Sequence, residues 1–276
     1  MVNFTAELAV PQEKAVSQRH QPVIEVRNLE KVYRTLRFGD VHAIKDVSFW
    51  VADGEFVAIV GPSGCGKSTM LKILAGLLPK SAGEVLLKGK PVEGPQAEFG
   101  VVFQSPVLLP WRTVFDNIMI PVEILRLGRA KFQERALSLI RMVGLNQFEK
   151  RYPYELSGGM QQRAAIVRAL IHDPAILLMD EPFGALDALT REQMNVELLR
   201  IWQESKKTIL FITHSISEAV FMADRVLVMT PRPGQVAEMV KINLPRPRSL
   251  EVINSDRFGA YAQHLRKMLQ VQGDLG

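Results

Sequence analysis

A glycine-rich stretch followed by a lysine and two hydroxyl residues is the part of this sequence most clearly equipped for chemistry. It consists of Gly61, Pro62, Ser63, Gly64, Cys65, Gly66, Lys67, Ser68 and Thr69, which fits the spacing Gly-x4-Gly-Lys-Ser/Thr. Glycines let such a loop turn its N–H groups inward, and a helix start adds unpaired N–H groups that meet phosphate oxygens. Lys67 would supply positive charge to the β- and γ-phosphates, and Ser68 a hydroxyl to Mg²⁺. The stretch therefore predicts a nucleotide-binding site.

Two adjacent carboxylates, Asp180 and Glu181, follow directly after the apolar segment Ala175–Met179. Charged groups belong at the carboxyl end of a buried strand, which is where α/β sheets bind ligands. Asp180 is suited to hold Mg²⁺, directly or through water, and Glu181 to accept a proton from an attacking water or to orient that water. Two solvated acids at a strand end are the alternative, and a small-molecule kinase or a GTPase would also fit these two motifs.

A second candidate anion site begins at Ser157, which is expected to cap a helix, while Gly158 and Gly159 would let a phosphate approach the exposed N–H groups. The motif reads Leu156-Ser157-Gly158-Gly159-Met160-Gln161-Gln162-Arg163. With this motif in place, the sequence resembles the ATP-binding-cassette (ABC) family over nearly all of residues 22–240. The resemblance implies an ATPase that uses ATP and Mg²⁺. It also implies that Ser157, Gly158 and Gly159 contact the ATP held by a second ATPase subunit, identical or different.

The resemblance assigns roles to four further positions that match the family. Tyr33 would stack on adenine, and a core tyrosine on a first strand is the alternative. Gln104 would touch Mg²⁺ or water and sense the γ-phosphate, and His214 would hydrogen-bond the γ-phosphate, although a lone histidine after an apolar strand is often structural. Asp187 would belong to a loop that crosses the dimer interface.

The elements that must position these groups alternate along the chain. We expect strands followed by helices of ten or more residues, a pattern that predicts a parallel sheet covered on both faces. The expected strands are Val23–Val32, Val41–Val51, Glu55–Val60, Glu84–Leu87, Phe99–Phe103, Ala175–Met179, Thr208–Thr213 and Arg225–Met229. The expected helices are Lys67–Leu78, Val122–Leu127, Phe132–Met142, Ala188–Glu204, Ser215–Met222 and Arg257–Leu269.

The fold class expected from this order is α/β. Combined with the resemblance, it becomes a P-loop NTPase with a mainly parallel core sheet, an antiparallel β subdomain and an inserted helical subdomain. Residues 1–21 would form a polar leader, residues 22–244 the ATPase domain, and residues 245–276 a C-terminal helical tail that packs on it. The helical subdomain is expected at about residues 105–168.

Composition constrains the setting. The chain has 276 residues, a formal net charge of +5 and one cysteine, so it can form no internal disulfide. Basic residues form no dense block, which gives no reason to expect a nucleic-acid partner. Its longest apolar runs are far shorter than the roughly 20 residues that span a bilayer. Any membrane role is therefore expected to come through a partner chain.

The resemblance is strongest to the ATPases of nitrate, sulfonate, taurine and bicarbonate importers, on the stretches Leu109–Val114, Thr190–Asn195 and Val228–Gly234. It implies an importer ATPase at the cytoplasmic face of the cell membrane, held there by integral-membrane permease subunits and working with an external solute-binding protein. The segment around Trp111 would receive a short helix of the permease. A soluble ABC ATPase of DNA repair or translation is the alternative.

Overall fold

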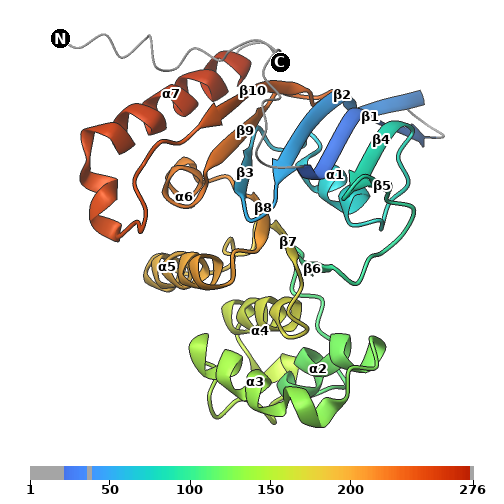
Figure 1. Ribbon diagram of the computed structural model, residues 1–276, viewed down its shortest axis with the longest axis vertical. Helices are drawn as coiled ribbons and strands as arrows, with labels where there is room; N and C mark the ends of the chain where they lie inside the picture. Colours follow the sequence, from blue (N-terminus) through green and yellow to red (C-terminus); the bar gives the residue numbers. More distant parts are fainter. Residues whose placement is uncertain (1–21, 36–38, 274–276) are drawn as a thin grey trace.

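A six-stranded sheet forms the centre of the molecule (Figure 1). The structure is a computed structural model that describes residues 22–35 and 39–273. Five strands run parallel in the order β9-β3-β8-β7-β6, and β10 adds to β9 in the antiparallel direction. The strands are β3 (Phe56–Val60), β6 (Phe99–Val102), β7 (Ile176–Asp180), β8 (Thr208–Ile212), β9 (Arg225–Met229) and β10 (Val236–Lys241).

A second, antiparallel sheet packs beside the first. Its strand order is β2-β1-β4-β5, and its strands are β1 (Pro22–Thr35), β2 (Gly39–Ala52), β4 (Ala82–Leu87) and β5 (Lys90–Pro91). The turn at Ala52–Gly54 leads from this sheet into β3, and the chain enters the antiparallel sheet again after α1 (Lys67–Leu74). Consecutive parts of the chain therefore alternate between the two sheets.

The two faces of the central sheet have different covers. One set of alternate strand residues, including Val57 and Ile59, packs against α1 and the antiparallel sheet. The other set, including Phe56 and Ala58, packs against the remaining helices. The central strands are apolar throughout because both of their faces are buried. These helices are α2 (Val114–Ile124), α3 (Arg129–Met142), α4 (Gly158–Leu170), α5 (Ala188–Ser205), α6 (Ile216–Met222) and α7 (Asp256–Gly273).

The helices α2, α3 and α4 form a separate layer at one end of the molecule, drawn at the bottom of Figure 1. They lie between β6 and β7 in the sequence, so they interrupt the alternation of strands and helices. Helix α4 joins this layer to the central sheet through its contacts with β6. The layer is the helical insertion expected from the sequence, and the expected P-loop NTPase architecture is confirmed.

The last part of the chain that the structure describes packs on the central domain through polar and apolar contacts. Arg248 is buried and donates hydrogen bonds to the carbonyl oxygens of Val220, Phe221 and Ala223, at the end of α6. Helix carbonyls at that end have no intrahelical partner and carry partial negative charge, so an arginine stabilises them. Burial lowers the pKa of Arg248 to about 10. Helix α7, on the same side, adds Phe258 and Leu265 to the core.

Several boundaries differ from the sequence expectation. Helix α1 ends at Leu74 rather than Leu78 because Gly76 has a φ of +70° and packs closely against Gly94. The helix expected at Val122–Leu127 is wrong in its bounds, since α2 begins after Thr113, whose hydroxyl accepts a hydrogen bond from the N–H of Asp116. The short strands β5 and β10 were not expected, and both lie at sheet edges.

A buried asparagine holds the loop that precedes α2. The side chain of Asn117 donates to the carbonyls of Leu109, Arg112 and Thr113 and accepts from the N–H of Leu109 at 2.7 Å. Asn117→Ala leaves these buried groups unpaired, and we expect it to lower the free energy of unfolding by about 2–4 kcal/mol. Urea unfolding checks the value, with the exposed Gln133→Ala as the control. Equal stability of the two variants would contradict the prediction.

Candidate nucleotide-binding and catalytic site

The glycine-rich loop connects β3 to α1 and packs closely against β2. Gly64 and Gly66 have φ values of +76° and +100°, which glycine adopts without strain. A Cβ at Gly66 would lie 2.8 Å from the carbonyl oxygen of Ala43 in β2, so only glycine fits there. Nζ of Lys67 donates to the carbonyl oxygens of Gly61 and Pro62, at 2.8 and 2.9 Å. The loop therefore curls around its own lysine.

Ser68 and Asp180 meet beneath this loop. The hydroxyl of Ser68 donates to Oδ1 of Asp180 at 2.9 Å, and Asp180 is only 3% exposed. Burial raises the pKa of Asp180, and the hydrogen bond from Ser68 opposes that rise. A buried carboxylate next to a hydroxyl is a donor pair that fits a hard cation such as Mg²⁺. In the part of the chain that the structure describes, no group of three or more His, Cys, Asp or Glu side chains could hold a metal ion.

Glu181 lies at the centre of a contact between three strand ends. Nε2 of Gln104 donates to one carboxylate oxygen of Glu181 at 3.3 Å, and Nε2 of His214 lies 2.7 Å from the other oxygen. These residues follow β6, β7 and β8, whose carboxyl ends are neighbours in the sheet. Glu181 has a φ of +48°, and its N–H donates to the carbonyl of Ile212. The backbone thus holds its carboxylate where it can contact both partners.

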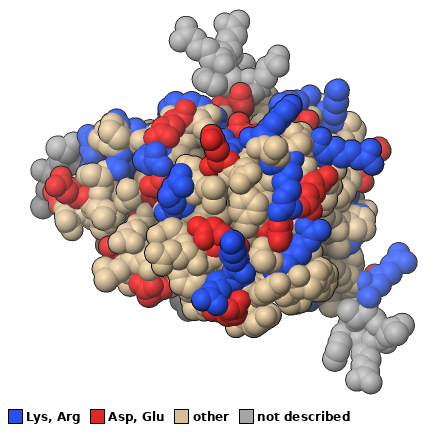
Figure 2. Space-filling model, turned by 90° about the horizontal axis from the view of Figure 1, so that it is seen from below, with Lys and Arg blue, Asp and Glu red and all other residues tan. Residues whose placement is uncertain are grey.

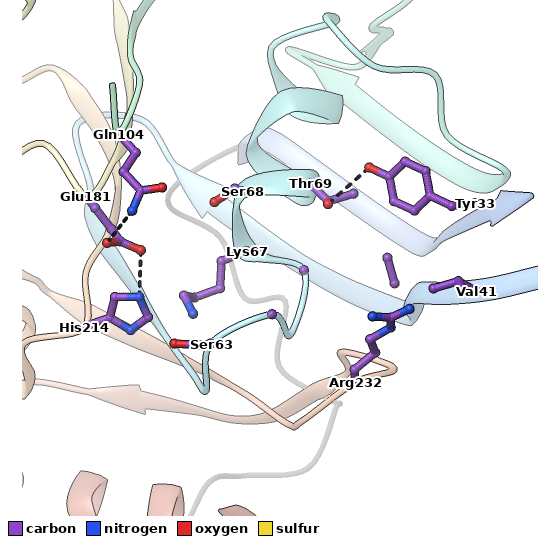
Figure 3. Close-up of a pocket in the computed structure, with 13 residues that line it drawn as sticks. Tyr33, Val41, Ser63, Lys67, Ser68, Thr69, Gln104, Glu181, His214 and Arg232 are labelled. Atoms are coloured by element: carbon purple, nitrogen blue, oxygen red, sulfur yellow. Dashed lines mark hydrogen bonds and ion pairs between the residues drawn. The ribbon is translucent and has the colours of Figure 1, made fainter. Parts of the chain in front are cut away.

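These groups line one end of a cavity of about 390 Å³ (Figure 3). Tyr33 lies at the other end, where its hydroxyl is 3.3 Å from that of Thr69. Tyr33 is 38% exposed as a residue, so it is not part of the core. The cavity is lined by Tyr33, Val41, Ala43, Ser63, Gly64, Gly66, Lys67, Ser68, Thr69, Gln104, Glu181, His214 and Arg232.

Most of the expected site residues therefore meet in one place. Gly61, Pro62, Cys65 and Asp180 are not part of the lining: the first three complete the loop, and Asp180 lies buried next to Ser68. Cys65 is fully buried, and burial raises the pKa of its thiol. A low-pKa, reactive thiol is thus not part of this site.

Val41, Ala43 and Arg232 were not predicted as site residues, because they come from segments far from the loop in the sequence. Glu218 was not predicted either. This buried carboxylate accepts a hydrogen bond from the hydroxyl of Thr213, and the same hydroxyl accepts from the N–H of Ser215. The turn that carries His214 is fixed in this way. An alternation of strand and helix gives no signal for such contacts, although the Pro-Arg-Pro-Gly run around Arg232 marks an irregular loop.

The structure does not bring the remaining expected residues into the cavity. Ser157 caps α4 by accepting from the N–H of Met160, and Asp187 caps α5 by accepting from the N–H of Thr190. Ser157, Gly158 and Asp187 are exposed, and none of the serine–glycine start of α4 lines the cavity. A Cβ at Gly159 would lie 3.2 Å from the side chain of Leu186, next to Asp187. The two helix starts therefore form one surface patch, apart from the phosphate loop.

The family model described as ABC transporter matches residues 44–184. The chain belongs to this family. A taurine import ATP-binding protein of Rhizobium johnstonii is 47% identical over 88% of this chain and 95% of its own length. An uncharacterized ABC transporter ATP-binding protein of Methanocaldococcus jannaschii is 48% identical over 91% of each chain. This chain is thus an ABC ATPase, which binds and hydrolyses ATP.

Solved structures of the family agree with this fold. The ATP-binding cassette MJ0796, in a dimeric post-hydrolysis state bound to ADP and Pi, matches this ABC ATPase with a TM-score of 0.73 and 33% identity. The match covers 80% of this chain and all of that one. Among residues 22–35 and 39–273, none of the helices combines the length and apolar character that crossing a bilayer requires.

The burial of Asp180 leads to a prediction about stability without nucleotide. A carboxylate whose pKa is raised by folding destabilises the native state once it ionises. We expect Asp180→Asn to raise the free energy of unfolding at neutral pH by about 1 kcal/mol, while ATP hydrolysis is lost. This increase in the free energy of unfolding should be complete above the raised pKa of the folded state. It should vanish well below the ordinary pKa of 3.8, where Asp180 is protonated in both the folded and the unfolded protein.

Asp173→Asn is the matched control with the opposite sign. The hydrogen bond from Lys207 lowers the pKa of Asp173, so its charge stabilises the fold above the unfolded-state pKa, and that stability disappears as the pH falls through the lowered value. Urea unfolding between pH 3 and pH 7 would measure both variants. A loss of stability in Asp180→Asn at neutral pH would contradict the prediction.

Proposed function

We propose that this ABC ATPase works as a head-to-tail dimer in which each ATP is held between two chains. The observation that supports this is the separation of the two anion sites. The phosphate loop lines the cavity, whereas the exposed serine–glycine start of α4 lies outside it. Helix N-termini bind phosphate, so the start of α4 is suited to the γ-phosphate held by another chain. The dimeric form of the cassette MJ0796 agrees with this arrangement.

Within each composite site, the side chains divide the chemistry. Lys67 binds the β- and γ-phosphates, and Tyr33 stacks on the adenine at the opposite end of the cavity. Glu181 orients the attacking water and accepts its proton, and His214 holds Glu181 and donates to the γ-phosphate. In the second chain, the hydroxyl of Ser157 completes the site from the other side.

Mg²⁺ fits the proposal through Ser68, Asp180 and Gln104. Asp180 is buried with a single hydroxyl partner, and three protein oxygens leave room for the phosphate and water ligands that Mg²⁺ prefers. When bound, the metal neutralises charge on the phosphates during transfer. Gln104 lies within hydrogen-bond distance of Glu181. A change at Glu181 during hydrolysis can therefore shift Gln104 and the loop that follows it.

That loop supports a role in coupling ATP hydrolysis to a membrane permease. Trp111 is 70% exposed and Val107 is 59% exposed. Neighbouring exposed apolar side chains of this size often mark a site that binds a partner. An exposed tryptophan on a fixed loop is a suitable anchor for a partner helix. We therefore propose that the permease contacts the chain around Trp111.

Two side chains of α4, one buried and one half-buried, connect this loop to the site. Gln162 of α4 donates to the carbonyl of Phe103, next to Gln104. Arg168 of α4 donates to the carbonyls of Pro106 and Val107, at 2.8 Å each. Because α4 begins at Ser157, a force on this helix from a second chain's nucleotide is transmitted to the loop that carries Trp111. Closure of the dimer would move the permease in this way.

The proposal thus describes the ATPase of an importer that acts at the cytoplasmic face of the membrane. Taurine import ATP-binding proteins of Rhizobium johnstonii and Yersinia pestis are 47% and 50% identical to this chain. The names of these relatives support a role in the import of a small solute. The proposed route of that solute is a separate permease, supplied by a solute-binding protein. On the face seen in Figure 2, basic and acidic side chains are interspersed with uncharged surface, and neither sign forms a block.

Mixing two inactive variants tests the head-to-tail dimer. Lys67→Ala removes the phosphate lysine, and Ser157→Arg blocks the start of α4, so each variant alone should lose at least 90% of ATP hydrolysis. A mixed dimer contains one site with Lys67 from one chain and Ser157 from the other, both intact. We expect mixing to restore activity, up to about a quarter of the wild-type level if half of the dimers are mixed. Steady-state phosphate release measures the recovery.

The control is a mixture of Lys67→Ala with the double variant Lys67→Ala/Ser157→Arg, which contains no intact composite site. No recovery in the first mixture, although both variants fold and form ATP-dependent dimers with wild-type chains, would overturn the proposed arrangement.

Replacement of the exposed tryptophan tests the permease contact. We expect Trp111→Ala to leave ATP hydrolysis by the isolated chain within twofold of wild type, since Trp111 does not line the cavity. Recovery of the permease with the tagged chain from detergent-solubilised membranes should fall about tenfold or more, as for an interface anchor. Trp50→Ala, which removes another exposed tryptophan on β2, is the control. Equal recovery with both variants would refute the contact.

A further inference from the structure

We propose that Arg232 is a further nucleotide-binding residue, which donates hydrogen bonds to the sugar and α-phosphate portion of ATP and ADP. This inference rests on the assignment of the cavity as the nucleotide site. Arg232 follows β9, more than 160 residues after the phosphate loop, and none of the roles described above involves it. Three observations support its assignment: a fixed loop, unused donors and its place in the cavity.

The loop that carries Arg232 is anchored to both walls of the site. The N–H of Gly234 donates to the carbonyl of Ala43 in β2, and the carbonyl of Gly234 accepts from the N–H of Lys45, each at 3.0 Å. On its other side, a Cβ at Gly234 would lie 1.9 Å from the carbonyl oxygen of Cys65 in the phosphate loop. No residue except glycine can approach that closely, so the loop is held directly against the phosphate loop.

Internal hydrogen bonds also stiffen this loop. The hydroxyl of Thr230 donates to the carbonyl of Pro231 at 3.0 Å and accepts from the N–H of Gln235 at the same distance. The N–H of Thr230 donates to the carbonyl of Gln235. Arg232 lies inside this closed loop, so its backbone position is fixed relative to the cavity. A fixed backbone reduces the freedom that the chain must lose when a ligand binds, although the side chain itself still has to be ordered.

The guanidinium group of Arg232 is available for a ligand. Within residues 22–35 and 39–273 it makes no hydrogen bond or ion pair to another side chain or carbonyl, in contrast to Arg225 and Arg246, which pair with Glu55 and Asp224. Arginine stays charged at any physiological pH and offers five N–H donors, which suits anionic oxygens. An unpaired arginine in a cavity beside Lys67 therefore favours a phosphate-bearing ligand.

The position of Arg232 indicates which part of the nucleotide it meets. In Figure 3 its side chain points toward Val41, on the side of the cavity that also holds Tyr33. Lys67 lies between Arg232 and the pair formed by Glu181 and His214. If the terminal phosphates lie near Glu181 and the base near Tyr33, the sugar and the α-phosphate are within the reach of Arg232. Both ATP and ADP carry these groups, so the contact should stabilise both nucleotides to the same degree.

Titration calorimetry with ADP and with a non-hydrolysable ATP analogue tests this inference. We expect Arg232→Ala to weaken binding of both nucleotides by the same factor of roughly ten, the loss expected for one charge-assisted hydrogen bond. Arg232→Gln, which keeps two donors without the charge, should weaken binding by a smaller factor. The midpoint of thermal unfolding without nucleotide should be unchanged in both variants, because the side chain has no protein partner to lose.

Two further variants separate the possible outcomes. Arg257→Ala, which removes an exposed arginine at the start of α7, should bind both nucleotides as wild type does. Lys67→Ala should no longer bind the ATP analogue. If Lys67→Ala binds more weakly and both Arg232 variants bind normally, or if Arg232→Ala weakens only the ATP analogue, the role assigned to Arg232 is wrong. If the wild-type chain binds neither nucleotide, the proposed function itself fails.

Discussion

The contact between Glu181 and its two partners depends on the order of strands in the central sheet. Gln104, Glu181 and His214 each follow a strand, and the order β8-β7-β6 makes those strand ends neighbours. The 2.7 Å contact from His214 and the 3.3 Å contact from Gln104 therefore exist only when all three strands are paired. Glu181 also has a positive φ, a conformation that costs a non-glycine residue of the order of 1 kcal/mol or more. This strained backbone conformation occurs at the residue whose carboxylate points into the cavity.

A second constraint is that the phosphate loop is clamped between two segments distant in the sequence. Gly66 packs on Ala43 from the antiparallel sheet, and Gly234 packs on Cys65 from the loop after β9. Close backbone approach at both points requires the absence of a Cβ, so glycine has a steric role here and not only a conformational one. The antiparallel sheet is consequently part of the site, since it supplies Tyr33, Val41 and Ala43 to the cavity.

The helical layer connects this site to the surface. Helix α4 is capped by Ser157. Its Gln162 donates to the loop that carries Gln104, and its Arg168 donates to the loop that leads to Trp111. Arg168 is half-buried where it holds two carbonyl groups, and this burial lowers its pKa. A rigid helix with contacts at both ends is the simplest physical connection between ATP hydrolysis and the exposed tryptophan.

The phosphate loop, the acidic pair and the serine–glycine helix start could all be predicted from local sequence patterns. Each of these depends on neighbouring residues, so glycine spacing, an apolar run or a capping serine was enough to predict it. The confirmed order of strands and helices has the same origin, because apolar patterns reflect burial within one element. The end of α1 was missed because Gly76 ends the helix in combination with a close contact to Gly94. The edge strand β10 was missed because its residues are mostly half-buried, which weakens the apolar pattern.

Which of the predicted groups share a cavity depends on the three-dimensional fold and could not be predicted from local patterns. The fold brings Tyr33 to the cavity from the antiparallel sheet and adds Arg232 from the loop after β9. It leaves Ser157 and Asp187 outside the cavity. These relations join residues separated by tens to more than a hundred positions. They are set by strand order and by backbone packing between sheets, and no local pattern of residues encodes either of these.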